Sequence, residues 1–379
     1  MFITICKDAT STFTSSHWYQ STDIIRLLAH AVERRRHAIF LTPSQLEAAL
    51  QHCDLGTTER RVLEGTYGSR IQDFAQWYRA SACRLIIDPN RNSAEIQLSA
   101  DGCDVRWPAP TFKEFEVYDW SELLGEHFRN DAEWYKLLAE KLYRYLGLHG
   151  LGPALRATHG GGGGMAAYFP ALRNTSTICA CIVDRDSAGD WLGPGKQARE
   201  CLKHVYKAKL LERPAVGVSD RRAFFAISVT SFRSVANSVP PSLLDIYFRE
   251  VAPNPAALSA IKAVFPTFPK LSGDEWRLWF GFPFEQATSV GELNADFGGK
   301  LSPAVLARAE AAISTGMQPR IPKGVTGALL DWAEGSAASL KAVRHHIAEA
   351  LEDDDYRSTM IASLRIACQF GAALVNPVI

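Results

Sequence analysis

Two aspartates, Asp184 and Asp186, directly follow an unbroken apolar segment, Ile178–Val183. Six apolar residues in a row predict a central parallel strand that is covered on both faces. In parallel α/β sheets, ligands gather beyond the carboxyl ends of the strands. Carboxylates at that edge suit Mg²⁺ or Mn²⁺, which bind oxygen ligands and substrate phosphates. The plainer alternative is that both aspartates only cap the turn after the strand.

A run of five glycines, 160–164, stands between a predicted strand at 155–158 and a predicted helix at 165–172. Gly160, Gly161 and Gly162 could approach a phosphate closely through backbone N–H groups, or they could form a turn without a ligand. The run is not a Walker A loop, because Met165 and Ala166 stand where Lys and Ser/Thr would be needed. His159, just before the run, is either a turn residue or a base beside the substrate phosphate.

Strands and helices alternate around these residues, which predicts an α/β fold with a parallel-dominated sheet. The predicted strands are 112–119, 155–158, 178–183 and 224–229, and the predicted helices are 131–146, 165–172 and 197–211. An α/β pattern also precedes residue 107, and the prolines in 107–110 indicate a boundary there. Beyond residue 241 the periodicity is helical. We therefore expect an N-terminal α/β domain (1–107), a middle domain (112–240) and a helical C-terminal region (241–379).

Composition predicts a globular protein of the cytoplasm. The chain has 41 basic and 41 acidic residues, and this balance argues against bulk electrostatic capture of nucleic acid. The N-terminus lacks a signal peptide, and no segment is apolar for long enough to span a membrane. Cys179 and Cys181 share one face of the predicted central strand, and we interpret them as buried thiols in a reducing compartment. Two basic segments, 34–36 and 203–209, are either solvated surface or contacts for a phosphate backbone.

The middle of the chain resembles the TOPRIM fold of the overcoming-lysogenization-defect nucleases and of TOPRIM effectors in bacterial anti-phage systems. The resemblance covers about a third of the chain. It rests on the helix that opens with Asn130-Asp131, on the glycine run, on Asp184-x-Asp186 and on the segment 231–241, which resembles a stretch after the fourth strand of such effectors. In the family the first strand ends in a Val-Glu-Gly or Val-Glu-Asn motif.

This chain departs from the family pattern at two positions. Strict alignment places Tyr118 where the family has its glutamate, so Glu116 or Asp119 would have to supply that carboxylate. Ala236 stands where a second glutamate is common. The departures leave two alternatives open: a competent metal site, or a TOPRIM domain that has lost activity and serves as a scaffold.

The resemblance implies a Mg²⁺- or Mn²⁺-dependent nuclease that acts on DNA or RNA in anti-phage defence. Asp184, Asp186 and Glu116 would bind the metal, with Asp119 and His159 as further catalytic candidates. Relatives often act beside a separate ATPase or another defence subunit, and a homo-oligomer is also allowed. The alternatives are a non-enzymatic structural or sensing subunit, and an N-terminal domain that carries the activity through Asp8 and Asp88.

Overall fold

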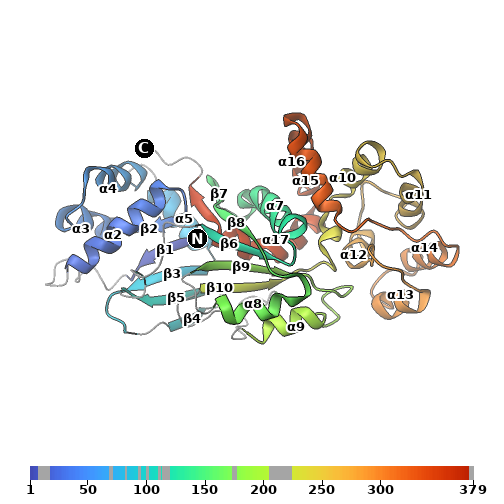
Figure 1. Cartoon of the computed structure of the whole chain (residues 1–379), viewed down its shortest axis with the longest axis horizontal. Helices are drawn as coiled ribbons and strands as arrows, with labels where there is room; N and C mark the ends of the chain where they lie inside the picture. The colour runs from blue at the N-terminus through green and yellow to red at the C-terminus, as the bar shows by residue number, and fades with distance from the viewer. Residues whose placement is uncertain are drawn as a thin grey trace.

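The computed structural model describes residues 1–6, 18–67, 71–81, 83–92, 95–99, 102–109, 112, 120–172, 177–204 and 224–374 of the 379-residue chain. It has an α/β fold with two mainly parallel sheets and a helical C-terminal region, as the sequence predicts. The two sheets lie next to each other in the N-terminal and middle parts of the molecule (Figure 1).

The first sheet has the strand order β2-β1-β3-β5-β4, and only the β4–β5 pair is antiparallel. Its strands are β1 (Phe2–Ile5), β2 (Ala38–Phe40), β3 (Cys83–Asp88), β4 (Glu95–Ser99) and β5 (Gly102–Pro108). The accompanying helices are α2 (Trp18–Glu33), α3 (Pro43–His52), α4 (Thr57–Val62) and α5 (Ile71–Ala80). β5 lies between β3 and β4, so β4 has no contact with β3 in the sheet ladder. Trp107 belongs to β5 and is fully buried, and Pro108 is tolerated because it ends the strand.

The second sheet has the order β10-β9-β6-β8, and all its strands are parallel. The strands are β6 (Ser121–Gly125), β8 (Leu155–His159), β9 (Ile178–Val183) and β10 (Phe224–Val229). β9 lies inside the sheet, as predicted. Our predicted first strand, 112–119, falls outside the described residues except for Phe112, and the strand that pairs with β9 is β6.

Helices cover both faces of the second sheet. On one face, α8 (Met165–Leu172) and α9 (Lys196–Leu202) pack on Cys179, Cys181 and Val183 of β9. On the other face lie α7 (Trp134–Leu142) and α17 (Asp354–Phe370), which contact each other closely. Burial on both sides explains why β9 is apolar at every position. Cys179 and Cys181 are buried free thiols on one face, as predicted.

The C-terminal region is helical, with one short strand outside both main sheets. Its remaining helices are α10 (Pro241–Ile246), α11 (Pro255–Val264), α12 (Asp274–Gly281), α13 (Val290–Phe297), α14 (Pro303–Ser314), α15 (Val325–Gly335) and α16 (Ala337–Ala350). Strand β11 (Ala372–Leu374) pairs with β7 (Leu151–Pro153). Among the described residues, no helix is long and apolar enough to cross a membrane.

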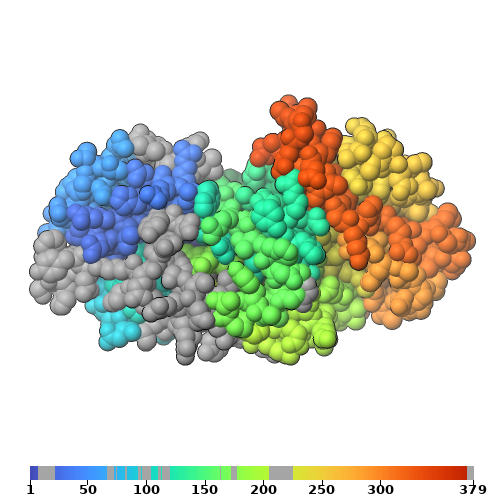
Figure 2. Space-filling model, viewed as in Figure 1, coloured from blue at the N-terminus to red at the C-terminus, as the bar shows by residue number. Residues whose placement is uncertain are grey.

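The molecule is elongated, and its first and last strands, β1 and β11, lie in the same half of it, where the Met1 amino group donates to the Ala372 carbonyl over 2.7 Å (Figure 1). Figure 2 shows the N-terminal elements in blue at one end and helices α11 to α14 in yellow and orange at the other, with the second sheet and its helices in green between them. The second sheet therefore lies between the first sheet and the helical C-terminal region, where segments from the middle and C-terminal parts meet.

Candidate functional site

The order of the second sheet reverses direction at the pair β6 and β9, and we call the space beyond the carboxyl ends of these two strands the crevice. From β6 the chain moves outward to β8, then returns to the other side of β6 to form β9 and β10. This reversal is a topological switch point, the place where open α/β sheets bind ligands beyond the carboxyl ends of their strands. The residues that leave these two strands are Glu126, after β6, and Asp184, after β9. Two carboxylates therefore flank the crevice.

Asp184 is partly buried and held by two hydrogen bonds. The Tyr135 hydroxyl of α7 donates to Asp184 Oδ1 over 2.7 Å, and the Val235 N–H donates to Asp184 Oδ2 over 3.0 Å. Burial raises the pKa of Asp184 well above its usual value, and the nearby carboxylates Asp131 and Glu126 raise it further. The two hydrogen bonds oppose this shift only in part. A cation in the crevice would relieve the remaining repulsion.

Asp186 is exposed, and its backbone has a left-handed conformation with φ of 58°. Its N–H donates to the Arg233 carbonyl over 2.9 Å, and Gly195 packs against its side chain so closely that a Cβ there would lie 2.5 Å from Asp186 Cβ. A non-glycine residue with positive φ stores strain, which is common where a functional side chain must be aimed. Although the residue is exposed, neighbouring groups displace part of the water around its carboxyl, which raises the pKa of Asp186, and the positive charge of Arg233 opposes that rise.

Glu126 is a candidate site residue that the sequence analysis did not predict. We expected the carboxylate of the first strand at Glu116 or Asp119, and both lie outside the described residues. Glu126 is partly buried, and its Oε1 atom has no hydrogen-bond partner among the described residues. Burial, followed by the charges of Asp131, Asp186 and Glu285, raises the pKa of Glu126 to about 7. The sequence signal that could have found it is Gly125-Glu126 directly before the helical turn at Phe128–Glu133.

Asp131, which opens the helix that resembles the family's, is buried, and its charge acts on Glu126. Its carboxylate accepts the His127 N–H over 2.8 Å, so it satisfies a backbone donor at the start of the helical turn. Burial raises the pKa of Asp131, while its hydrogen bond from His127 acts in the opposite direction. Asp131 therefore anchors the segment that carries Glu126 and adds negative potential there.

The glycine run packs on the backbone of the Glu126 segment. The Gly160 N–H donates to the Gly125 carbonyl over 2.8 Å, and the Gly162 N–H donates to the Glu126 carbonyl over 2.9 Å. Gly161 and Gly162 both have positive φ. His159 is exposed, and its Nδ1 accepts the Gly161 N–H over 2.8 Å. These contacts give the run a structural role, and the predicted contact with phosphate remains a prediction.

Replacing Gly160 with alanine should disturb the position of Glu126. A Cβ there would lie 2.6 Å from the Gly125 carbonyl oxygen and 2.8 Å from Met165 Cε, so the backbone would have to shift. We expect a loss of about 1–3 kcal/mol in the free energy of unfolding, measured by urea denaturation. Gly164→Ala is the matched control, because a Cβ at Gly164 would meet nothing within 4 Å. Equal stability of the two variants would contradict this packing.

The segment after β10 contacts Asp184 and is held in place by a buried amide. Asn237 is fully buried, and its Nδ2 donates to the carbonyls of Trp279, over 2.6 Å, and Phe282, over 2.9 Å. The neighbouring Val235 N–H is the donor to Asp184. Ala236, where the family has a glutamate, is also fully buried, so no carboxylate enters the site from this position.

Asn237→Ala should destabilise the protein strongly. The substitution removes the donors to two buried carbonyls and leaves a small void, which costs about 2–4 kcal/mol. Urea denaturation of the wild type and the variant measures this. Asn294→Ala is the control, because Asn294 is exposed on α13 and should change stability little. A loss for Asn237→Ala no larger than that of the control would show that the segment is not held by this amide.

The carboxylates fit a cation that takes few protein ligands. Among the described residues, no group of three or more His, Cys, Asp or Glu side chains is arranged to hold one metal ion. Mg²⁺ usually binds one or two carboxylates, with water and substrate phosphates completing its shell. The raised pKa values of Glu126, Asp184 and Asp186, and the unpaired Oε1 of Glu126, match this donor set.

Asp88 and the described parts of the two basic segments that the sequence singled out make contacts away from the carboxylate site. Asp88 is buried and pairs with Arg91 over 3.2 Å and Arg106 over 3.5 Å, and Asp8 lies outside the described residues. The Arg36 guanidinium lies over the Trp120 ring, 3.5 Å from its centroid. Lys203 pairs with Glu200 over 2.6 Å, and residues 207 and 209 lie outside the described residues.

Comparison with known proteins adds no relative. No protein-family model, no curated protein and no solved structure matches this chain.

Proposed function

We propose that this chain is a Mg²⁺-dependent nuclease of TOPRIM type that hydrolyses phosphodiesters of DNA or RNA. The observation that carries the proposal is the pairing of Glu126 and Asp184 at the carboxyl ends of the two strands that flank the switch point. Their mutual electrostatic effect shows in the pKa of Asp184, which Glu126 helps to raise. Negative charge concentrated in such a crevice favours a divalent cation and, through it, a phosphate group.

Each carboxylate has a role that follows from its surroundings. Asp184 and Asp186 would hold Mg²⁺ or Mn²⁺, which when bound polarises the phosphodiester and stabilises charge on its oxygens. Glu126 takes the place that we first assigned to Glu116 or Asp119. With a pKa of about 7 it can accept a proton from an attacking water near neutral pH. The resemblance further suggests a cytoplasmic anti-phage effector that works beside a separate ATPase or another defence subunit.

A second candidate function is a non-enzymatic subunit of a defence complex. The observation that favours it is that both carboxylate oxygens of Asp184 already accept hydrogen bonds from the protein, from Tyr135 and Val235. A carboxylate with these partners can act as a structural bridge between α7 and the segment after β10. The two functions differ in whether a divalent cation binds.

The test is a cleavage assay on the purified full chain. Single-stranded DNA, duplex DNA and RNA are each incubated with Mg²⁺, with Mn²⁺ or with EDTA, and thermal unfolding is recorded under the same conditions. We expect cleavage that the chelator stops and an unfolding temperature that the metal raises. If neither metal supports cleavage of any substrate and neither shifts thermal unfolding, the nuclease proposal fails and the structural subunit is favoured.

A further inference from the structure

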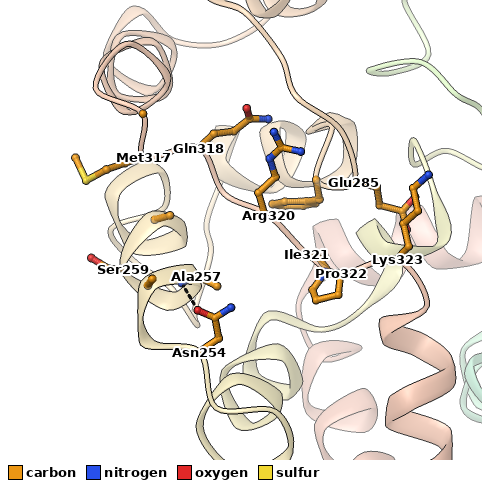
Figure 3. A pocket seen from close by; sticks show the side chains of 14 residues that line it. Asn254, Ala257, Ser259, Glu285, Met317, Gln318, Arg320, Ile321, Pro322 and Lys323 are labelled. Carbon is orange, nitrogen blue, oxygen red and sulfur yellow. Dashed lines mark hydrogen bonds between the residues drawn. The ribbon is translucent and has the colours of Figure 1, made fainter.

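A groove of about 810 Å³ lies in the C-terminal region, between α11 and the segment that connects α14 to α15 (Figure 3). Ala257, Ala260 and Phe284 give it apolar walls, and Arg320 and Lys323 are exposed among its lining residues. Its size is typical of a site that holds a ligand. The groove belongs to no part of the carboxylate site described above.

Glu285 connects the groove electrostatically with the carboxylate site. Glu285 lines the groove, and its pKa is raised by burial and by Asp131, while Lys323 opposes that rise. Glu285 in turn raises the pKa of Glu126. The two sites therefore share an electrostatic environment, with Glu285 acting on both.

The chain directly after Lys323 packs against the helical turn that follows Glu126. Gly324 has a φ of 78°, and a Cβ there would lie 3.5 Å from the side chain of Asn130. A Cβ at Gly327 would lie only 2.3 Å from Asn130 Oδ1. Asn130 belongs to the helical turn that follows Glu126. Lys323 is thus the last residue of the groove before the chain packs on the turn beside the carboxylates.

Arg320 is a cation without a partner at this junction. It forms no hydrogen bond or ion pair with any residue in the described ranges, although most arginines of the C-terminal region are paired. The chain as a whole carries no net charge, so positive charge available to a polyanion is local. Cations along a partly apolar groove suit single-stranded nucleic acid, because its phosphates can pair with the cations while its unpaired bases lie against the apolar surface.

We propose that this groove binds a single-stranded segment of the nucleic-acid substrate next to the carboxylate site, with Arg320 and Lys323 contacting its phosphates. The inference rests on the proposed nuclease function and adds the substrate class. A duplex fits less well, because its bases are stacked and paired inside the helix and cannot reach the apolar wall.

The test is binding of a labelled 12-nucleotide single strand, followed by fluorescence anisotropy in EDTA, where metal-dependent cleavage cannot occur. We expect Arg320→Gln to weaken binding about tenfold at low salt, which is the effect of losing one hydrogen bond to a charged group. The slope of log affinity against log salt should become shallower by about 0.7. Arg320→Lys should restore most of the affinity. Lys262→Gln, an exposed cation on α11 outside the groove, is the control and should bind as the wild type does.

Three results would overturn the groove proposal: no binding of the single strand, equal salt slopes for wild type and Arg320→Gln, or tighter binding of a duplex of the same length. Each leaves the nuclease proposal open, because cleavage is measured separately with Mg²⁺. Conversely, Arg320-dependent binding without cleavage under any condition would support the groove and contradict the nuclease.

Discussion

Asp184→Asn should abolish Mg²⁺-dependent cleavage while the fold persists. Losing one of two metal-binding carboxylates removes several kcal/mol of charge stabilisation, so we expect a rate loss of about a thousandfold or more. Asparagine can still accept the Val235 N–H and can donate to the Tyr135 hydroxyl, so the contacts of Asp184 survive. Cleavage assays and thermal unfolding with EDTA and with excess Mg²⁺ measure both effects.

In the wild type, Mg²⁺ at about a hundred times its dissociation constant should stabilise the fold by about 2.7 kcal/mol, and the variant should lose this effect. Asp104→Asn is the control. Asp104 pairs with Arg84 in the first sheet, so its loss should lower stability without changing the response to Mg²⁺. Asp184→Ala should also be less stable than Asp184→Asn by about 1–3 kcal/mol, because two donors lose their acceptor. A Mg²⁺ response that survives in Asp184→Asn would contradict the assigned metal site.

Glu126→Gln should remove most activity and stabilise the metal-free protein above neutral pH. The pKa of Glu126 is about 7 when folded, against an ordinary value of 4.5. The folded state therefore binds this proton more tightly than the unfolded state does. The contribution of Glu126 to stability is fully present below pH 4.5 and is lost as the pH rises from 4.5 to 7, when this carboxyl would ionise in the unfolded but not in the folded protein. Glutamine stays neutral and avoids this cost, which is about 1–2 kcal/mol after allowance for partial solvent exposure.

Thermal unfolding in EDTA at pH 5 and pH 8 tests this difference. We expect Glu126→Gln to gain on the wild type at pH 8 and to show little gain at pH 5. Cleavage by the wild type should rise through pH 7, and the variant should be about a hundredfold to ten-thousandfold slower if Glu126 is the base. Glu122→Gln is the control on the same strand, because it only removes the ion pair with Arg156. An equal gain at both pH values would show that the ionisation of Glu126 does not oppose folding.

The sequence was informative where burial alone determines the pattern. Ile178–Val183 is apolar throughout because helices cover both faces of β9, so the strand and the aspartates after it could be placed to the residue. The first strand could not be placed in the same way. β6 contains a glutamate, Glu122, which pairs with Arg156 of β8 over 2.6 Å. That pairing exists only once the sheet has formed, so β6 looks too polar in sequence for a buried strand.

The same limit affected the site and the last helix. Glu126 was not predicted because the strand before it was placed at 112–119. Its electrostatic interaction with Glu285 joins segments that are far apart in sequence. The acidic run at 352–355 is typical, in sequence, of a solvated helix end. In the structure Asp353 caps the start of α17, where its side chain accepts hydrogen bonds from the N–H groups of Asp355 and Tyr356. Acidic residues favour a helix N-terminus, so the composition correctly indicates a helix end. It does not show that this end is the start of α17.

The position of α17 has a consequence for biosynthesis. This helix covers one face of β9 and β10, and its Ser363 accepts the Ser228 hydroxyl through its carbonyl over 2.9 Å. Yet α17 spans Asp354–Phe370, so a ribosome makes it long after the strands that it covers. Until it emerges, the nascent sheet exposes an apolar surface, and such surfaces make folding intermediates prone to aggregation. Burial of this face of the second sheet must therefore wait until Asp354–Phe370 has been synthesised, more than a hundred residues after β10.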